Sequence, residues 1–212
     1  MKKTAINRRD PRVVSTRGLV LLKNSHPEIR RLKRAEHEPS IHGNKIWNSS
    51  FLVMDYLQRH RPPKGAAFMD LGCGWGQLGI YARKRLEQKV QAVDADPEVF
   101  PYLELLAEIN KTPIKTRVAR FEKLKTAELK GYHTIAGADI CFWDELTPVL
   151  YNLIRRSLKA GVKRMIIADP GRSPFYELVE RCEKKKLDIE VVERKTSTPK
   201  PFEADLLVIH NS

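Results

Sequence analysis

The chain has 212 residues, of which 42% are hydrophobic and 8% aromatic, a composition that fits one globular domain with a substantial core. Its formal net charge of +13 makes it strongly basic. No apolar run reaches the ~18 residues that a membrane-spanning helix needs, and the N-terminus lacks the apolar segment of a secretory signal. We therefore expect a cytoplasmic protein without a membrane partner.

The positive charge is concentrated near the N-terminus. Residues 1–45 hold twelve Lys and Arg against four Asp and Glu, a net +8 of the total +13. Such a field attracts an acidic partner, whether a protein, an RNA or an anionic surface. The alternative interpretation is that this basic segment is a solvated, partly disordered leader without a partner. Within this stretch, residues 18–22 are expected to form a short strand and residues 27–35 a short helix. We interpret residues 1–40 as a basic extension, a lid or substrate-binding segment, and residues 41–212 as the main domain.

Hydrophobic periodicity sharpens from Trp47 onward. The apolar spacing predicts a helix from Trp47 to Leu57 that ends before the prolines at 62–63. Beyond it, the predicted strands are 67–71, 90–93, 116–121, 134–142, 164–168, 189–193 and 206–210, and the predicted helices are 77–86, 97–109, 146–158 and 173–186.

This alternation of strands and helices predicts an α/β fold with βαβ units and a mostly parallel sheet of about seven strands. The last two strands have no helix between them, so they are expected to pair as a hairpin. One of them must then run antiparallel to the other strands. At two helix starts a proline follows a short polar residue: Asp96 before Pro97 and Ser173 before Pro174 are both predicted to be N-caps.

The segment DLGCGWG, residues 70–76, lies where a predicted strand meets a helix. Glycines there let the backbone turn sharply and approach a ligand closely. In an open α/β sheet, ligands bind outside the carboxyl ends of the strands. Asp94 ends the next strand, where its carboxylate can accept hydrogen bonds from both hydroxyls of a ribose. Residues 74–79 also read G-x-G-x-x-G, the dinucleotide fingerprint, so the glycines alone indicate only a nucleotide-like ligand.

Two features favour S-adenosyl-L-methionine over a dinucleotide. Asp70 precedes the glycines, where it can address a methionyl ammonium group, and little chain remains for a separate catalytic domain. The run DLGCGWG followed by VDAD at 93–96 resembles motif I and the following acid of class I methyltransferases. That resemblance implies a Rossmann-like seven-stranded sheet with helices on both faces and an antiparallel C-terminal strand. It implies cofactor contacts from Asp70, Gly72, Cys73, Gly74, Gly76, Asp94, Ala95, Phe121 and Gly137.

Three further segments are similar to the seven-strand protein lysine methyltransferases, in the branch that includes the electron transfer flavoprotein β-subunit lysine methyltransferase. They are HGNKIWNSS (42–50), GADICFWDE (137–145) and IADPGR (167–172). By this resemblance, Trp47 lines the cofactor pocket and Asp139 lies where the acceptor nitrogen approaches. The rings of Phe142 and Trp143 can hold a cation. The sequence departs from the family at Phe142, where the family has tyrosine.

The implied function is methylation of a protein lysine, with a protein substrate. Other interpretations stay open: Trp47 as a core aromatic, Asp139 as a helix cap, and Arg172 as a member of a structural ion pair. The basic N-terminus motivates an RNA methyltransferase, but the sequence shows neither an N/D-P-P-Y motif nor an RNA-binding module. A small-molecule methyltransferase with residues 1–40 as its lid, and a non-catalytic binding module, are further alternatives.

Metal binding is not expected from this sequence. The three cysteines and six histidines show no metal-ligand spacing, and the cysteines are interpreted as reduced thiols.

Overall fold

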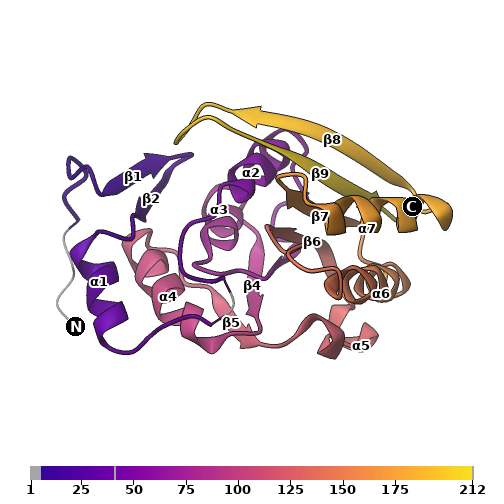
Figure 1. Ribbon diagram of the computed structural model, residues 1–212, viewed down its shortest axis with the longest axis horizontal. Coiled ribbons are helices and arrows are strands. Elements are labelled where there is room, and N and C mark those ends of the chain that lie inside the picture. Colours follow the sequence, from indigo (N-terminus) through magenta and orange to yellow (C-terminus); the bar gives the residue numbers. More distant parts are fainter. Residues whose placement is uncertain (1–5, 41, 212) are drawn as a thin grey trace.

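Seven strands form one sheet in the order β5-β4-β3-β6-β7-β9-β8 in the computed structural model, which describes residues 6–40 and 42–211 (Figure 1). The five strands from β5 to β7 are parallel, β9 runs antiparallel to β7, and β8 pairs with β9 as a hairpin. This confirms the predicted Rossmann-like arrangement. The strands are β3 (Ala67–Leu71), β4 (Lys89–Asp94), β5 (Lys115–Val118), β6 (Tyr132–Ala138), β7 (Arg164–Asp169), β8 (Ile189–Thr196) and β9 (Phe202–His210).

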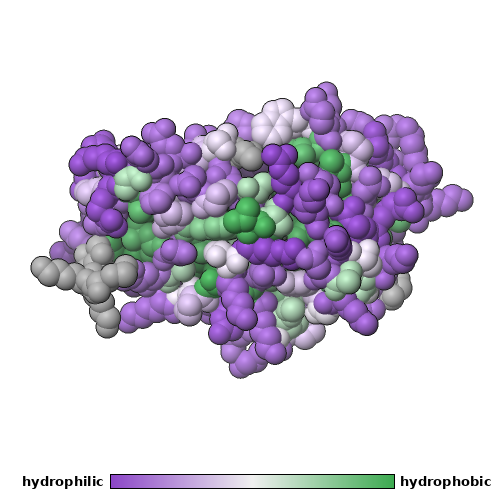
Figure 2. All heavy atoms as spheres, turned by 90° about the horizontal axis from the view of Figure 1, so that it is seen from below, coloured by the Kyte–Doolittle hydropathy of each residue, from purple (hydrophilic) through white to green (hydrophobic). Residues whose placement is uncertain are grey.

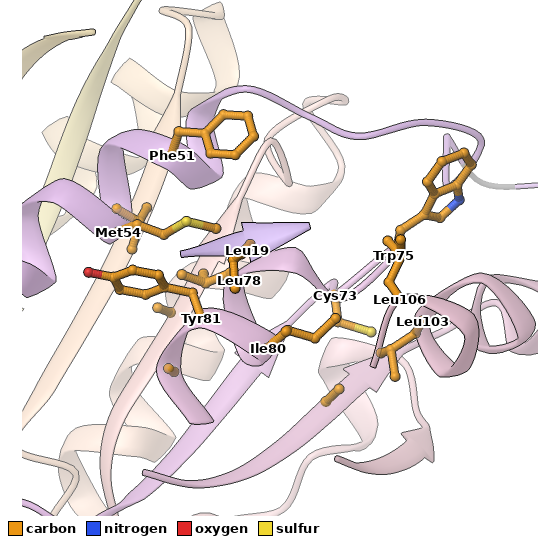
Figure 3. Packing of buried hydrophobic residues seen from close by; sticks show 14 of the residues in the cluster. Leu19, Phe51, Met54, Cys73, Trp75, Leu78, Ile80, Tyr81, Leu103 and Leu106 are labelled. Carbon is orange, nitrogen blue, oxygen red and sulfur yellow. The ribbon is translucent and has the colours of Figure 1, made fainter. Parts of the chain in front are cut away.

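Helices cover both faces of the sheet, because successive strand side chains point to opposite sides. Phe68 of β3 packs into a core with α2, α3 and α4, whereas its neighbour Met69 packs into a core with α6 and α7. Figure 3 shows side chains of α2, α3 and α4 meeting in the first core. The helices are α2 (Ser49–Arg59), α3 (Gln77–Arg85), α4 (Phe100–Ile109), α5 (Thr126–Leu129), α6 (Leu146–Lys159) and α7 (Ser173–Lys184).

The N-terminal segment is built into the first core. β1 (Val13–Thr16) and β2 (Leu19–Leu22) form a separate antiparallel hairpin, and α1 (Pro27–Arg34) follows it. Asn110, at the end of α4, bonds both the N–H and the C=O of Val20, at 2.9 and 2.8 Å. The function of residues 1–40 as a lid or substrate-binding segment stays a prediction. The buried side chains of residues 6–40 are Leu19, Val20, Leu21, Leu22, His26, Ile29 and Leu32.

Two predicted strands end earlier than expected. β5 ends at Val118, and Phe121 instead opens the short 3₁₀ helix η2 (Phe121–Lys123). β6 ends at Ala138 because Asp139 has a φ of 56°, in the left-handed region, which breaks the extended backbone. Phe142 therefore lies in a loop and not in the strand.

Helix starts also differ from prediction. Trp47 lies outside α2, which begins at Ser49, and the N-cap of α7 is Arg172 and not Ser173. Asp96 is confirmed as an N-cap, because its side chain accepts from the N–H of Glu98 at 2.9 Å. It opens the 3₁₀ helix η1 (Pro97–Val99), which continues into α4. Strand β1 and helix α5 were not predicted.

Hydrophobic and hydrophilic side chains occupy different parts of one face of the molecule (Figure 2). Figure 2 shows hydrophobic side chains gathered in a band across this face, with hydrophilic side chains bordering it. In the described part of the chain, no helix has both the length and the apolar character needed to cross a membrane.

Candidate functional site

A cavity of about 190 Å³ lies at the carboxyl ends of β3, β4 and β6. The chain runs outward from β3 through β4 to β5 and then crosses to β6 on the other side of β3, so this edge is the topological switch point where α/β sheets bind ligands. A smaller pocket adjoins the cavity and shares Trp47, Gly72 and Gly74 with it. Of the sequence-predicted residues, the cavity is lined by Trp47, Gly72, Gly74, Asp94, Ala95, Phe121, Asp139, Phe142 and Trp143, and the smaller pocket also by Asp70 and Cys73.

The glycine turn uses left-handed backbone at Gly72, Gly74 and Gly76, with φ of 63°, 49° and 72°. A Cβ on Gly74 would meet nothing within 4 Å, whereas one on Gly76 would lie 2.5 Å from Cγ of Leu103. Gly74 is thus open to the cavity, and Gly76 permits close packing of the turn on α4. Neither Gly76 nor Gly137 lines either pocket; Gly137 pairs with Leu71 and Ile167 inside the sheet.

Asp94 is fixed by the loops around it. Its Oδ2 accepts from the N–H of Gly74 at 2.9 Å, and its Oδ1 accepts from the N–H of Asp96 at 3.0 Å. Burial raises the pKa of this carboxyl above its usual range, against the effect of these backbone donors. The geometry holds a rigid acceptor at the end of β4, beside the glycine turn.

Buried acceptor groups line the smaller pocket. Asp70 Oδ2 accepts from the N–H of Gly79 at 2.8 Å, and burial raises the pKa of Asp70 to about 8. Gln77 donates from Nε2 to the C=O of Trp47 and to Ser50 Oγ, both at 3.2 Å. Its buried Oε1 has no hydrogen-bond partner among the described residues. This pocket therefore fits a ligand group that carries N–H donors, and a cationic group there would favour the ionised form of Asp70.

At the far end of the cavity, Asp139 and Asp169 share Arg172. Arg172 donates to Asp169 Oδ2 at 2.7 Å, but its two terminal nitrogens lie 3.4 Å from Asp139 Oδ1. Asp139 Oδ2 also accepts from the N–H of Ser49, at the first turn of α2, at 3.2 Å. Burial raises the pKa of Asp139. Arg172 is thus bound chiefly to Asp169, which leaves Oδ1 of Asp139 only weakly engaged.

Aromatic rings cluster around that carboxylate. The ring of Phe142 stacks on His42 with centroids 4.3 Å apart, and Cζ of Arg172 lies 4.1 Å from the same centroid. The ring of Phe142 therefore contacts both His42 and Arg172. Trp47 meets Phe142 edge to face at 5.2 Å, and Trp143 is 44% exposed. Trp143 is therefore the more accessible of the two rings predicted to hold a cation.

Several lining residues were missed by sequence reasoning. They lie in loops or at the ends of helices and strands, where periodicity does not distinguish a lining residue from its neighbours. They include His42, Gly43, Ser50, Trp75, Gln77, Leu78, Arg120, Glu122, Ala138, Ile140 and Leu146.

The three cysteines are free and buried, and burial raises the pKa of each thiol, that of Cys182 to about 11. Over residues 6–40 and 42–211, no group of His, Cys, Asp and Glu side chains could hold a metal ion.

Comparison with known proteins identifies the family to which the chain is similar. A family profile described as "Lysine methyltransferase" matches residues 27–174. The electron transfer flavoprotein beta subunit lysine methyltransferase of Xenopus laevis is 31% identical over 112 residues, which span 53% of this chain and 45% of that protein. The chain therefore aligns with less than half the length of this relative.

Solved structures share the fold at low sequence identity. The human methyltransferase 10 domain containing protein matches with a TM-score of 0.61 and 11% identity, covering 79% of this chain and 84% of that one. Magnesium protoporphyrin IX methyltransferase from Synechocystis PCC 6803, solved with bound SAM, matches with a TM-score of 0.60 and 16% identity, covering 77% and 78%. These similarities establish the fold.

Proposed function

This chain belongs to the lysine methyltransferase family, and from that premise we propose that it transfers a methyl group from S-adenosyl-L-methionine to the side-chain nitrogen of a protein lysine. One observation carries the proposal. A single cavity joins the glycine turn and Asp94 at one end to Asp139 and the aromatic cluster at the other. A cofactor and an acceptor nitrogen can therefore meet inside it, and methyl transfer depends mainly on such positioning.

The residues at the cofactor end fit S-adenosyl-L-methionine. Asp70 and the unpartnered Oε1 of Gln77 would accept from its ammonium group, and Asp94 would accept from its ribose hydroxyls. Ala95 and Phe121 would contact the adenine. When bound, this cofactor supplies an electrophilic methyl group. The chain contributes fixed acceptors and a glycine turn that lets the backbone come close.

At the acceptor end, we assign Asp139 the binding and orientation of the incoming lysine. Among the described residues, its Oδ1 has only the long contacts to Arg172, so an ammonium group can displace them. Trp47 and Trp143 exclude water from the cavity, and desolvation favours the neutral amine that can attack. Because Phe142 contacts both His42 and Arg172, we assign it to positioning Arg172.

The location and the partner belong to the same proposal. Three buried, unpaired thiols suit a reducing compartment, so we place the enzyme in the cytoplasm. The substrate is a protein, in keeping with the name of the Xenopus relative.

A labelling experiment tests the reaction. The purified protein is incubated with methyl-labelled S-adenosyl-L-methionine and a cell lysate, and samples are then treated with protease or with RNase. We expect label that protease releases and RNase leaves in place, and that amino-acid analysis recovers as methyllysine. Label that survives protease and is lost with RNase would point to an RNA substrate and overturn the proposal.

A further inference from the structure

A second hollow, of about 730 Å³, lies between the N-terminal hairpin and the β8–β9 turn. Its lining joins segments that are far apart in sequence: residues 13–16 of β1, residues 21–24, the loop residues 45, 46 and 48, and residues 198–200 of the turn. Apolar side chains of Val14, Ile46 and Phe51 are part of the lining, and none of the lining residues is Asp or Glu. We call this hollow the hairpin groove.

Arg17 fixes the position of one wall of the hairpin groove. At the tip of the β1–β2 hairpin, it donates from Nε and NH2 to the two oxygens of Asp55 on α2, at 2.7 and 2.5 Å. It also donates to the C=O of Thr198 at 2.8 Å and to Thr196 Oγ1 at 2.9 Å. The hairpin, α2 and the β8–β9 turn are thereby tied together, so the hairpin groove is a built feature of the fold.

Three lysines give the hairpin groove its charge. Lys23, Lys45 and Lys200 line it and are exposed. None of them forms a salt bridge with any residue in 6–40 or 42–211, whereas Arg12 and Arg17 nearby are paired with Asp10 and Asp55. The positive charge that the lysines carry is therefore available to a partner.

Lys45 connects the hairpin groove to the catalytic cavity. It lines the groove, and its Nζ lies 4.0 Å from the ring centroid of Trp47, which lines the cavity. Ile46 and Asn48, on either side of Trp47 in the sequence, also line the groove. A chain seated in the groove is thus held next to the site that receives the acceptor nitrogen.

We propose that the hairpin groove docks an extended, acidic segment of the protein substrate beside the lysine to be methylated. The inference rests on the proposed lysine methyltransferase function. Acidic side chains complement the three lysines, and aliphatic side chains of the segment suit Val14 and Ile46. A single-stranded RNA is disfavoured because such ligands stack on exposed rings, and the only ring in the lining, Phe51, is 1% exposed.

Peptide binding tests the proposal without requiring turnover. Two fluorescent peptides carry one central lysine, flanked by Asp and Glu in the first and by Asn and Gln at the same positions in the second. Anisotropy is measured with the wild type, with Lys23→Gln/Lys45→Gln/Lys200→Gln, and with the exposed control set Lys130→Gln/Lys159→Gln/Lys185→Gln. A further variant, Lys23→Gln/Lys200→Gln, leaves the contact between Lys45 and Trp47 intact.

We expect the wild type and the control set to bind the acidic peptide about tenfold more tightly than the neutral one at low salt, since three exposed charge contacts contribute modestly each. The preference should vanish in the triple groove variant, fall in the double variant and weaken with added salt. Equal binding of both peptides by the wild type, or an unchanged preference in the triple variant, overturns the inference. So does an RNA oligonucleotide of equal charge that displaces the acidic peptide at lower concentration.

The experiments distinguish a wrong docking proposal from a wrong assignment of the methylation reaction. Methyllysine in the lysate assay combined with an unchanged peptide preference in the triple variant rejects only the groove. A groove-dependent preference for the acidic peptide without any methyllysine confirms the docking surface and rejects the proposed reaction.

Discussion

Arg172 and Phe142 are stacked, with Cζ of the guanidinium 4.1 Å from the ring centroid. Phe142 stands where the family resemblance leads one to expect tyrosine. The cation that its ring contacts is the guanidinium group of Arg172. This contact, together with the 2.7 Å bond to Asp169, keeps Arg172 at the side of Asp139. The aromatic character of residue 142 is therefore tied to the placement of Arg172 beside Asp139.

Removing this ring tests its assigned role. Phe142→Ala deletes a cation–π contact of about 0.5–2 kcal/mol, so we expect a roughly 2- to 30-fold loss of kcat/KM for the protein substrate. Phe142→Tyr keeps the ring and should stay close to wild type. Initial rates with both variants measure the effect, and a Phe142→Ala variant with wild-type rates would show that the ring is dispensable.

Asp94 should control cofactor affinity. Asp94→Ala removes a carboxylate acceptor, and the loss of one charge-assisted hydrogen bond of about 1.5–3 kcal/mol corresponds to a roughly 10- to 150-fold weaker Kd for S-adenosyl-L-methionine. Isothermal calorimetry measures the change, with Asp188→Ala, an exposed acid remote from the site, as the control. An Asp94→Ala variant that binds as tightly as the control contradicts the assignment.

Asp139 should affect turnover more than cofactor binding. Asp139→Asn preserves the size and an oxygen that can accept from Ser49, and asparagine tolerates the left-handed backbone at this position. We expect kcat to fall on the order of 100-fold while the cofactor Kd stays within about threefold, because misplacing a reacting group by about 1 Å can cost a factor of this order. Full activity in Asp139→Asn would assign the residue to capping α2 alone.

Asp70 should make the folded protein less stable as pH rises. Its pKa is about 8 in the folded state, against about 3.9 in an unfolded chain, so between these values the folded state binds more protons. The contribution of this group to the free energy of unfolding therefore falls between pH 4 and pH 8 and is constant above. Asp70→Asn removes the titration and should gain stability over wild type across this range. Urea unfolding at pH 5, 7 and 9 checks this, and a difference between the two proteins that does not change with pH contradicts it.

Gly76 should be required for stability and not for ligand contact. Gly76→Ala forces a side chain into left-handed backbone and within 2.5 Å of Leu103, for an expected loss of about 2–3 kcal/mol in the free energy of unfolding. Gly131→Ala is the matched control, since its φ is 90° but its Cβ meets nothing within 4 Å, so it should lose only about 1 kcal/mol. Equal losses in the two variants would show that contact with Leu103 is unimportant.

Local signals sufficed for most of the fold. Strand β3 begins and ends at the predicted residues, Ala67 and Leu71. A short apolar run that is followed by glycines is typical of a buried strand, so its ends could be predicted. The ends of β5 and β6 were predicted too late because apolar residues continue past them. Phe121 and Phe142 lie beyond the strand ends and line the cavity. Because they are apolar, hydrophobic periodicity does not distinguish them from residues of the strands.

The sequence by itself determined the alternation of strands and helices, the glycine turn, and the acids at the ends of β3, β4 and β6. These are local properties of hydrophobic period and backbone conformation. Only the tertiary structure brought Phe142 into contact with His42 and Arg172, left Gln77 Oε1 without a partner among the described residues, and joined residues 13–24 to residues 198–200 through Arg17. Those relationships depend on contacts between residues up to 181 positions apart, and such contacts exist only once the hydrophobic cores have brought the segments together.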